Sequence, residues 1–171
     1  LAIRLEMLGE NHLDTAQCYN DLGVVSGKLG DNEKYLEYAK KGLEIRLALN
    51  APGEILAESY ANVGNAYKYI GNKEKNLECQ IQALQLRRKA YGDMHLDTAN
   101  SYNELGCAYS DLQQDEKYLE YSLKALEIRR ALVGDKHPDT AHSYNNVAVA
   151  YMCFDRYPEA IEQLKQALKI E

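Results

Sequence analysis

Tryptophan is absent from the 171 residues, and the chain contains one phenylalanine, three prolines and eleven glycines. So few prolines and glycines leave little room for linkers or low-complexity segments. Hydrophobic residues make up 46% of the chain and charged residues 27%, which is typical of an ordered, soluble protein. The composition therefore excludes a disordered tail and predicts a folded protein.

Long apolar runs are also absent. The longest, VAVAYMCF at residues 147–154, is far shorter than the roughly 20 residues that a membrane-spanning helix needs. The N-terminal stretch LAIRLEMLGE interrupts its apolar residues with Arg4 and Glu6, which argues against a signal peptide. It also begins without methionine. We therefore expect no membrane segment, and we expect a fragment of a longer chain.

Cysteines and basic residues are present but not clustered. The four cysteines form no CxxC pair, so a zinc or redox motif has no support. Reduced, partly buried thiols are the simplest interpretation, and they indicate a reducing, cytoplasmic compartment. The net charge is −6, and the lysines and arginines are dispersed among acidic neighbours. Nucleic acid is therefore not an expected partner, because phosphate binding needs clustered basic side chains.

What the sequence does contain is a repeat. The stretch GDMHLDTANSYNELG at 92–106 returns as GDKHPDTAHSYNNVA at 134–148 and as GENHLDTAQCYNDLG at 9–23. The helix that follows each signal contains an aliphatic residue that recurs at spacings of 41, 42 and 42 residues: Leu22, Val63, Leu105 and Val147. A tyrosine stands three residues before it, a glycine or alanine directly after it, and a serine or tyrosine four residues after it. Positions −3, 0 and +4 share one stripe of a helix.

A second helix closes each unit, over residues 32–46, 73–88, 115–130 and 157–170. Its aliphatic ladder keeps the same spacing: Leu36, Leu77, Leu119 and Ile161. Residues 1–8 match the end of such a helix. The sequence therefore predicts the end of a preceding repeat at 1–8, followed by four repeats at 9–49, 50–91, 92–133 and 134–171.

A period of 41–42 residues with two helices per unit is the signature of an all-α solenoid. Each helix pair alone leaves an apolar face bare, and stacking on its neighbour covers that face. The small residues after the aliphatic position are expected to let the second helix approach closely, at the cost of a mid-helix glycine. They are Gly23, Gly64, Gly106 and Ala148.

The motif Y-x-x-[LV]-[GA]-x-x-Y, followed by a second helix with a small residue before a leucine, resembles the tetratricopeptide repeat (TPR). The 42-residue period and the H-x-D-T-A motif resemble the long-period repeats of kinesin light chain and nephrocystin. The resemblance covers essentially the whole chain. It implies a right-handed superhelix of stacked helix-turn-helix hairpins with a concave side that binds partner proteins.

The recurring histidines, His12, His95 and His137, hold one position of the repeat, at the turn before the first helix. Equivalent residues of neighbouring repeats lie roughly 10 Å or more apart, whereas metal ligands converge within roughly 2.0–2.6 Å of one ion. The histidines are therefore interpreted as the start signal of a helix and not as a metal site. No GxSxG, phosphate-loop or HExxH motif is present, and neither an enzyme nor a cofactor is expected.

The resemblance also implies which residues face the concave groove, namely those two before and two after the aliphatic position of the first helix, with further candidates near both helix ends. Our candidates for peptide binding are Asn20, Lys28, Asn65, Lys68, Tyr69, Asn100, Asn103, His142, Asn145 and Met152. A side-chain amide offers both a donor and an acceptor to a peptide backbone. The alternative is that the asparagines only stabilise hairpin packing.

The expected partner is an extended peptide segment of another protein. Lys28 and Lys68 favour an acidic segment, although Asp111 stands at the matching place in the third repeat. The sequence leaves the oligomeric state open. A second hypothesis is a spacer or sensor arm of a larger protein, which would contact its own chain or an oligomeric partner.

Two second helices depart from the family pattern. Tyr35 and Tyr118 stand about one turn beyond the usual aromatic position, with a small residue four further on, which we interpret as a volume-conserving swap. In the second repeat, Asn76 and Gln80 take these places, and buried amides need hydrogen-bond partners. A tilted, partly solvated helix is the favoured explanation, and a weak point that bends or binds is the alternative.

Overall fold

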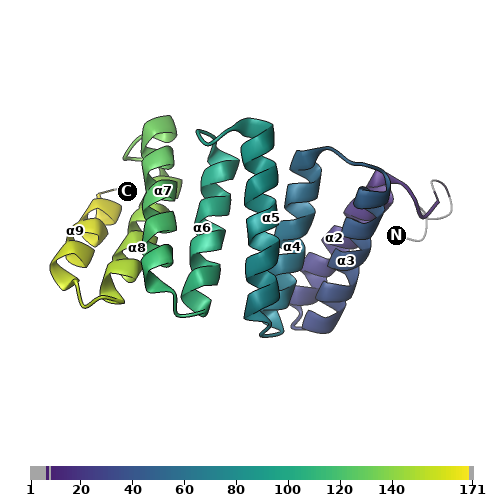
Figure 1. The fold of residues 1–171 in the computed structure, drawn as a ribbon, viewed down its shortest axis with the longest axis horizontal. Helices are drawn as coiled ribbons and strands as arrows, with labels where there is room; N and C mark the ends of the chain where they lie inside the picture. Colours follow the sequence, from purple (N-terminus) through teal and green to yellow (C-terminus); the bar gives the residue numbers. More distant parts are fainter. Residues whose placement is uncertain (1–6, 8, 170–171) are drawn as a thin grey trace. The chain divides into compact units, whose positions relative to one another are not determined.

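The computed structural model describes Met7 and residues 9–169, and within this part of the chain every regular element is an α-helix (Figure 1). The helices are α2 (Leu13–Lys28), α3 (Asn32–Ala48), α4 (Gly53–Tyr69), α5 (Lys73–Tyr91), α6 (Leu96–Asp111), α7 (Asp115–Val133), α8 (Pro138–Met152) and α9 (Tyr157–Leu168). The expected all-α fold is confirmed. The expected end of a preceding repeat at 1–8 lies outside the described residues, apart from Met7.

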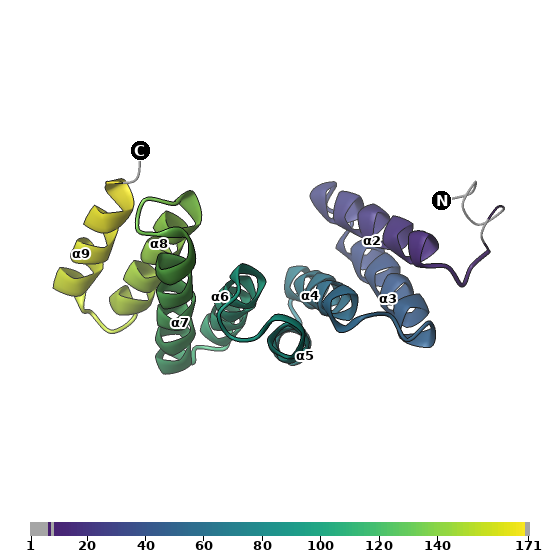
Figure 2. The ribbon, with the colours of Figure 1, turned by 90° about the horizontal axis from the view of Figure 1, so that it is seen from above.

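The chain divides into two compact units, Leu1–Ala90 and Tyr91–Glu171. In the first unit α3 packs on both α2 and α4, and α2 also contacts α4; these helices can be followed in Figure 2. In the second unit α7 packs on both α6 and α8, and α9 packs on α8. In each unit a second helix is therefore covered by the first helix of the hairpin that follows it, as stacking of repeats requires.

The histidines of the recurring motif begin the first helices. His12, His95 and His137 are the N-cap residues of α2, α6 and α8. Each ring nitrogen Nδ1 accepts a hydrogen bond from the backbone N–H of the aspartate two residues later, at 3.1, 3.1 and 3.2 Å. A helix leaves its first N–H groups without partners inside the helix, and this bond satisfies one of them. The interpretation of the histidines as start signals is confirmed.

The other residues of the motif close the same turn. Its glycine has a positive φ of 80–84° in all three copies, a conformation that favours glycine. The threonine hydroxyl donates to the carbonyl of that glycine at 2.8–2.9 Å. In the last two copies the tyrosine hydroxyl also donates to the aspartate after the glycine, at 2.8 Å. The recurring residues of the motif therefore form one hydrogen-bonded turn.

Two hairpins place a tyrosine against the glycine of the facing helix. Tyr35 is 5% exposed and Tyr118 is 4% exposed, so the shifted aromatic residues are core residues. A Cβ atom added to Gly23 would lie 3.1 Å from the Tyr35 ring, and one added to Gly106 would lie 3.4 Å from the Tyr118 ring. The close approach predicted at these glycines is confirmed at Gly23, whereas an added Cβ at Gly106 would make ordinary van der Waals contacts.

The hairpin of α4 and α5 has an amide interior. Asn76 and Gln80 are each 2% exposed, and Gln80 Nε2 donates to the side-chain carbonyls of both Asn76 and Asn65 at 3.3 Å. The prediction of a partly solvated helix is therefore wrong. The physical reason is that the two amides, one turn apart, satisfy each other and a third amide on the facing helix, so neither needs water.

Candidate functional site

The ten candidate residues for peptide binding all lie on the first helices of the hairpins, α2, α4, α6 and α8. Asn20 and Asn103 are buried, at 1% and 6% exposure. Asn65 is half-buried. The exposed members are Lys28, Lys68, Tyr69, Asn100, His142, Asn145 and Met152. The structure therefore separates two asparagines that hold helices together from a larger set that solvent can reach.

The two buried asparagines bond across to the next first helix of their own unit. Asn20 Nδ2 on α2 donates to Ser59 Oγ on α4 at 3.5 Å. In the second unit, Asn146 Nδ2 on α8 donates to Asn103 Oδ1 on α6. Both bonds correspond to the packing role that the sequence left open as the alternative for these amides.

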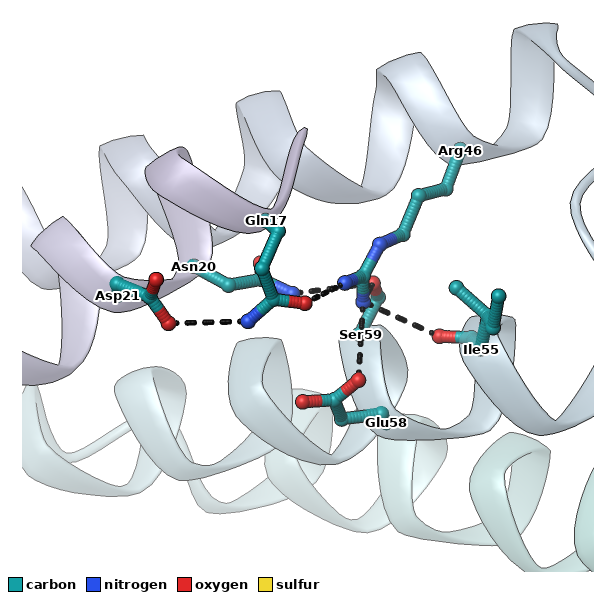
Figure 3. A network of polar contacts seen from close by, with 7 residues as sticks. All are labelled: Gln17, Asn20, Asp21, Arg46, Ile55, Glu58 and Ser59. Carbon is teal, nitrogen blue, oxygen red and sulfur yellow. Dashed lines mark hydrogen bonds and ion pairs between the residues drawn. The ribbon is translucent and has the colours of Figure 1, made fainter. Parts of the chain in front are cut away.

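A buried arginine, which the sequence reasoning did not single out, lies beside the start of the first helices. Arg46 on α3 is 3% exposed (Figure 3). Its Nη1 donates to Ser59 Oγ at 2.7 Å and to the carboxylate of Glu58 at 3.3 Å, while Nη2 donates to Gln17 Oε1. Nη1 also donates to the Ile55 carbonyl at 3.3 Å. This Arg46 cluster joins α2, α3 and α4.

The second unit repeats the arrangement around Arg129 on α7, which is 5% exposed. Its Nη1 donates to the Asp139 carbonyl at 3.1 Å and to Ser143 Oγ at 2.6 Å. Its Nη2 donates to Asn100 Oδ1 at 2.6 Å. Because a guanidinium has no acceptor, Asn100 must turn its carbonyl to Arg129, which leaves its amide N–H groups for other partners.

The electrostatics of the Arg129 cluster are dominated by burial. Burial lowers the pKa of Arg129, while the negative charges of Asp139 and Glu104 act in the opposite direction. The Nε atom of Arg129 is buried without a hydrogen-bond acceptor. A buried charged donor without a partner carries a desolvation cost.

On α8 the candidates form one exposed stripe. His142, Asn145 and Met152 are exposed, and Val149 between them is 44% exposed. Their spacing of three, four and three residues keeps them on one helix face. Tyr69, the one tyrosine among the candidates, lies elsewhere, near the turn between α2 and α3. Its backbone carbonyl accepts a hydrogen bond from Asn32 Nδ2 at 3.4 Å, and the centroid of its ring lies 6.2 Å from that of Tyr35.

Among the described residues no group of three or more His, Cys, Asp or Glu side chains could hold a metal ion. No helix in this part of the chain is long and apolar enough to cross a membrane. Burial raises the pKa of Cys79 to about 11, so this thiol stays protonated at neutral pH.

The arrangement of the helices is similar to that of several solved structures. The chain aligns over 98% of its length with 68% of BtubC (BKLC) from P. vanneervenii, with a TM-score of 0.88 and 21% identity. It aligns over 99% of its length with 80% of a putative kinesin light chain of Podosopora anserina that has nearly identical TPR-like repeats, with a TM-score of 0.84 and 22% identity. A third match, over 60% of the apo form of RapI, has a TM-score of 0.84 and 16% identity.

At these identities the solved structures show the fold alone, and no curated protein matches the sequence at a significant level. The tetratricopeptide repeat family matches residues 55–117 and 116–170, which is more than half of the chain. The resemblance read from the repeat motif is confirmed. The chain belongs to the tetratricopeptide repeat family.

Proposed function

We propose that this chain binds an extended peptide segment of a partner protein on the exposed face of its first helices. That it is a protein-interaction scaffold in general follows from its repeats and its fold. The observation that supports the finer proposal is the stripe of His142, Asn145, Val149 and Met152 on α8. It combines amide, imidazole and apolar groups on an exposed face, which is what an extended segment with alternating side chains and a polar backbone needs.

The experiment is a selection of displayed random peptides against the chain, run in parallel against Asn145→Arg. The substitution places a long charged side chain in the middle of the stripe, and Asn145 is exposed, so the fold should be retained. Leu123→Arg on α7, at a side chain that is 40% exposed, is the matched control. We expect consensus peptides on the wild type and on Leu123→Arg that are lost on Asn145→Arg. No enrichment on a folded wild type would contradict the proposal and favour a spacer or sensor arm.

We further propose that the chain acts as an adaptor without catalysis and in a reducing, cytoplasmic compartment. Its family and its kinesin light chain-like neighbours are typically non-enzymatic. No cysteine forms a disulfide in the described residues, which suits such a compartment. Fractionation of cells that produce the chain, with a thiol-reactive probe at Cys153, would contradict the location if the protein were found oxidised outside the cytoplasm.

A further inference from the structure

The third hairpin has a surface cluster of a glutamate, a tyrosine and a lysine on its second helix. The Tyr121 ring on α7 stacks on the Tyr102 ring on α6, with the ring centroids 5.9 Å apart. Lys124 Nζ lies 5.8 Å from the centroid of the Tyr102 ring and forms an ion pair with Glu120 at 2.6 Å. This Glu–Tyr–Lys cluster therefore covers a tyrosine of the first helix with a second ring and a cation.

The first hairpin has the same cluster at the equivalent positions of the repeat. The rings of Tyr38 on α3 and Tyr19 on α2 have their centroids 6.1 Å apart. Lys41 Nζ lies 5.8 Å from the centroid of the Tyr19 ring and forms an ion pair with Glu37 at 2.7 Å. Two hairpins that share few other surface residues therefore fill this place with the same three groups.

The second hairpin has an open pocket at this place. It keeps the glutamate and the tyrosine of the first helix, as Glu78 and Tyr60, but Cys79 and Gln82 stand where the other hairpins have the tyrosine and the lysine. A pocket of about 360 Å³ is lined by these four residues and Ile81. Its volume lies within the range of ligand pockets, roughly 300–1,000 Å³. The pocket therefore takes the place of a missing ring and a missing cation.

The walls of this Tyr60 pocket suit an aromatic ring. Burial raises the pKa of Cys79 to about 11, so its thiol is neutral at pH 7 and acts as a small apolar group. The ammonium groups of Lys40 and Lys75, the cations beside this hairpin, lie over the Tyr67 ring, each 5.2 Å from its centroid. The face of Tyr60 is therefore left to a ring that enters the pocket.

The rim of the pocket supplies a negative charge. Glu78 is exposed, and it has Gln82 in place of the lysine with which Glu37 and Glu120 form ion pairs. A carboxylate at the edge of an apolar pocket favours a cation next to the bound ring.

The fourth hairpin shows that loss of the tyrosine and the lysine need not leave the carboxylate open. Gln163 stands at the place of the tyrosine, and Gln166 at the place of the lysine donates to Glu162 at 2.7 Å. In the second hairpin Gln82 is exposed and makes no such bond within the part of the chain that the structure describes. The combination of an apolar pocket and an available carboxylate therefore distinguishes the second hairpin.

We propose that the Tyr60 pocket binds an aromatic side chain of a partner protein that has a basic residue beside it. The partner's ring takes the place of Tyr121 and stacks on Tyr60, and its cation takes the place of Lys124 and pairs with Glu78. Four of the five lining residues are on the second helix α5, so the site is separate from the exposed stripe of α8. This inference goes beyond the proposed peptide binding and does not depend on it.

The first test uses three small phenols: tyramine, which carries an ammonium, neutral p-cresol, and 3-(4-hydroxyphenyl)propanoate. Each is titrated into ¹⁵N-labelled protein while the backbone amides of residues 78–82 are followed by NMR. We expect tyramine to bind about threefold more tightly than p-cresol, and the propanoate to bind most weakly. Glu78→Gln should remove the difference between tyramine and p-cresol. Equal binding of all three phenols by the wild type would overturn the proposal.

Two double variants test the position of the site. Cys79→Tyr/Gln82→Lys fills the pocket with the residues of the other hairpins and should abolish the response to tyramine. The converse variant, Tyr121→Cys/Lys124→Gln, should open an equivalent pocket, so that the amides of residues 120–124 respond to tyramine with an affinity like that of the wild-type site. Melting curves show that each variant is folded. An unchanged response in the filled variant, or none in a folded converse variant, would contradict the equivalence.

The partner is tested by selecting displayed random peptides on the wild type and removing those that also bind the filled variant. We expect the remaining peptides to share Tyr, Phe or Trp within about one helical turn of Lys or Arg. If tyramine binds but no such peptides remain, the protein partner is overturned and the pocket is a site for a free aromatic amine. Peptides that bind the filled variant but not Asn145→Arg belong to the α8 stripe, so failure of either proposal is distinguishable from failure of the other.

Discussion

The second and third repeats build the same hairpin with opposite interiors. In the third, Tyr118 lies over Gly106 with Ser122 one turn later; in the second, the equivalent positions are Asn76 and Gln80 over Gly64. One interior is aromatic, and the other is a network of amides that bond to each other and to the facing helix. Both interiors are buried to within a few per cent.

In both hairpins the repeat backbone sets the volume of the interior, and the hydrogen-bond partners available there determine whether an aromatic ring or a set of amides can fill it. An aromatic ring stabilises by burying apolar area. An amide network stabilises only when every member finds a partner, because an unpaired buried amide costs about 1–3 kcal/mol. The amide hairpin should therefore be more sensitive to single changes in polarity, and the aromatic hairpin more sensitive to loss of volume.

Loss of volume should have the largest effect. Tyr118→Ala removes a buried ring that packs on Gly106, and it should lower the free energy of unfolding by about 3–5 kcal/mol. Denaturant titration measures this, with Tyr157→Ala as the control, since Tyr157 is 54% exposed on α9 and should lose about 0.5 kcal/mol or less. Equal losses for the two variants would show that Tyr118 is not a core residue.

Breaking the amide network should come next. Gln80→Leu removes the donor shared by Asn65 and Asn76, and it should cost about 1–3 kcal/mol although leucine is more apolar than glutamine. Gln82→Leu, at an exposed position of the same helix, is the control and should be close to neutral. A more stable Gln80→Leu variant would mean that the amides carry no network, and that the two interiors follow the same rule.

Substitution by alanine should change stability in opposite directions at Gly64 and at Gly106. An added Cβ at Gly64 would lie 2.8 Å from Gln80 Nε2 and 3.1 Å from Asn76 Oδ1, whereas at Gly106 its nearest neighbours lie 3.4–3.5 Å away. Gly106→Ala should stabilise by about 0.5–1 kcal/mol through helix propensity, and Gly64→Ala should destabilise by about 1 kcal/mol through overpacking. Melting curves of the pair decide this, and a shift in the same direction for both would contradict the difference in packing.

The smallest expected change in stability concerns the N-terminal caps of α4 and α6, the first helices of the two repeats. The α6 helix has a side-chain cap from His95, whereas α4 begins after Pro52 with no side-chain cap. His95→Ala should lower stability by about 0.5–1 kcal/mol, and His95→Asn, which keeps an acceptor, should recover most of it. Amide exchange of the Asp97 N–H, which donates to His95, reports the cap directly. An unchanged exchange rate in His95→Ala would show that the cap contributes nothing.

The fold could be predicted from the sequence because each two-helix repeat places an aliphatic residue at the same position, at Leu22, Val63 and their equivalents. The shifted tyrosines could also be placed, since a large residue and a small one exchanged positions. The amide interior was placed wrongly, because single residues such as Gln80 do not show where their hydrogen-bond partners lie.

The arginine clusters were missed for a related reason. Arg46 and Arg129 stand in the repeated tripeptide E-I-R of the second helices, and that recurrence was the available signal. Arginine on the surface of a helix is common, however, and only the structure shows that these two are buried. The peptide-binding role of the candidate residues remains a prediction, because composition and period say nothing about which exposed side chains meet a partner.

The Arg46 cluster also has a mechanical consequence. One guanidinium holds Gln17 on α2, belongs to α3 itself, and holds Ser59 on α4 (Figure 3). Pulling α2 or α4 away would leave a buried cation with fewer acceptors, so separating either helix carries the desolvation cost of an incompletely paired guanidinium. The Arg46 cluster therefore couples the unfolding of the helices that it joins. A force applied to the N-terminal end of this unit should release α2, α3 and α4 in one step.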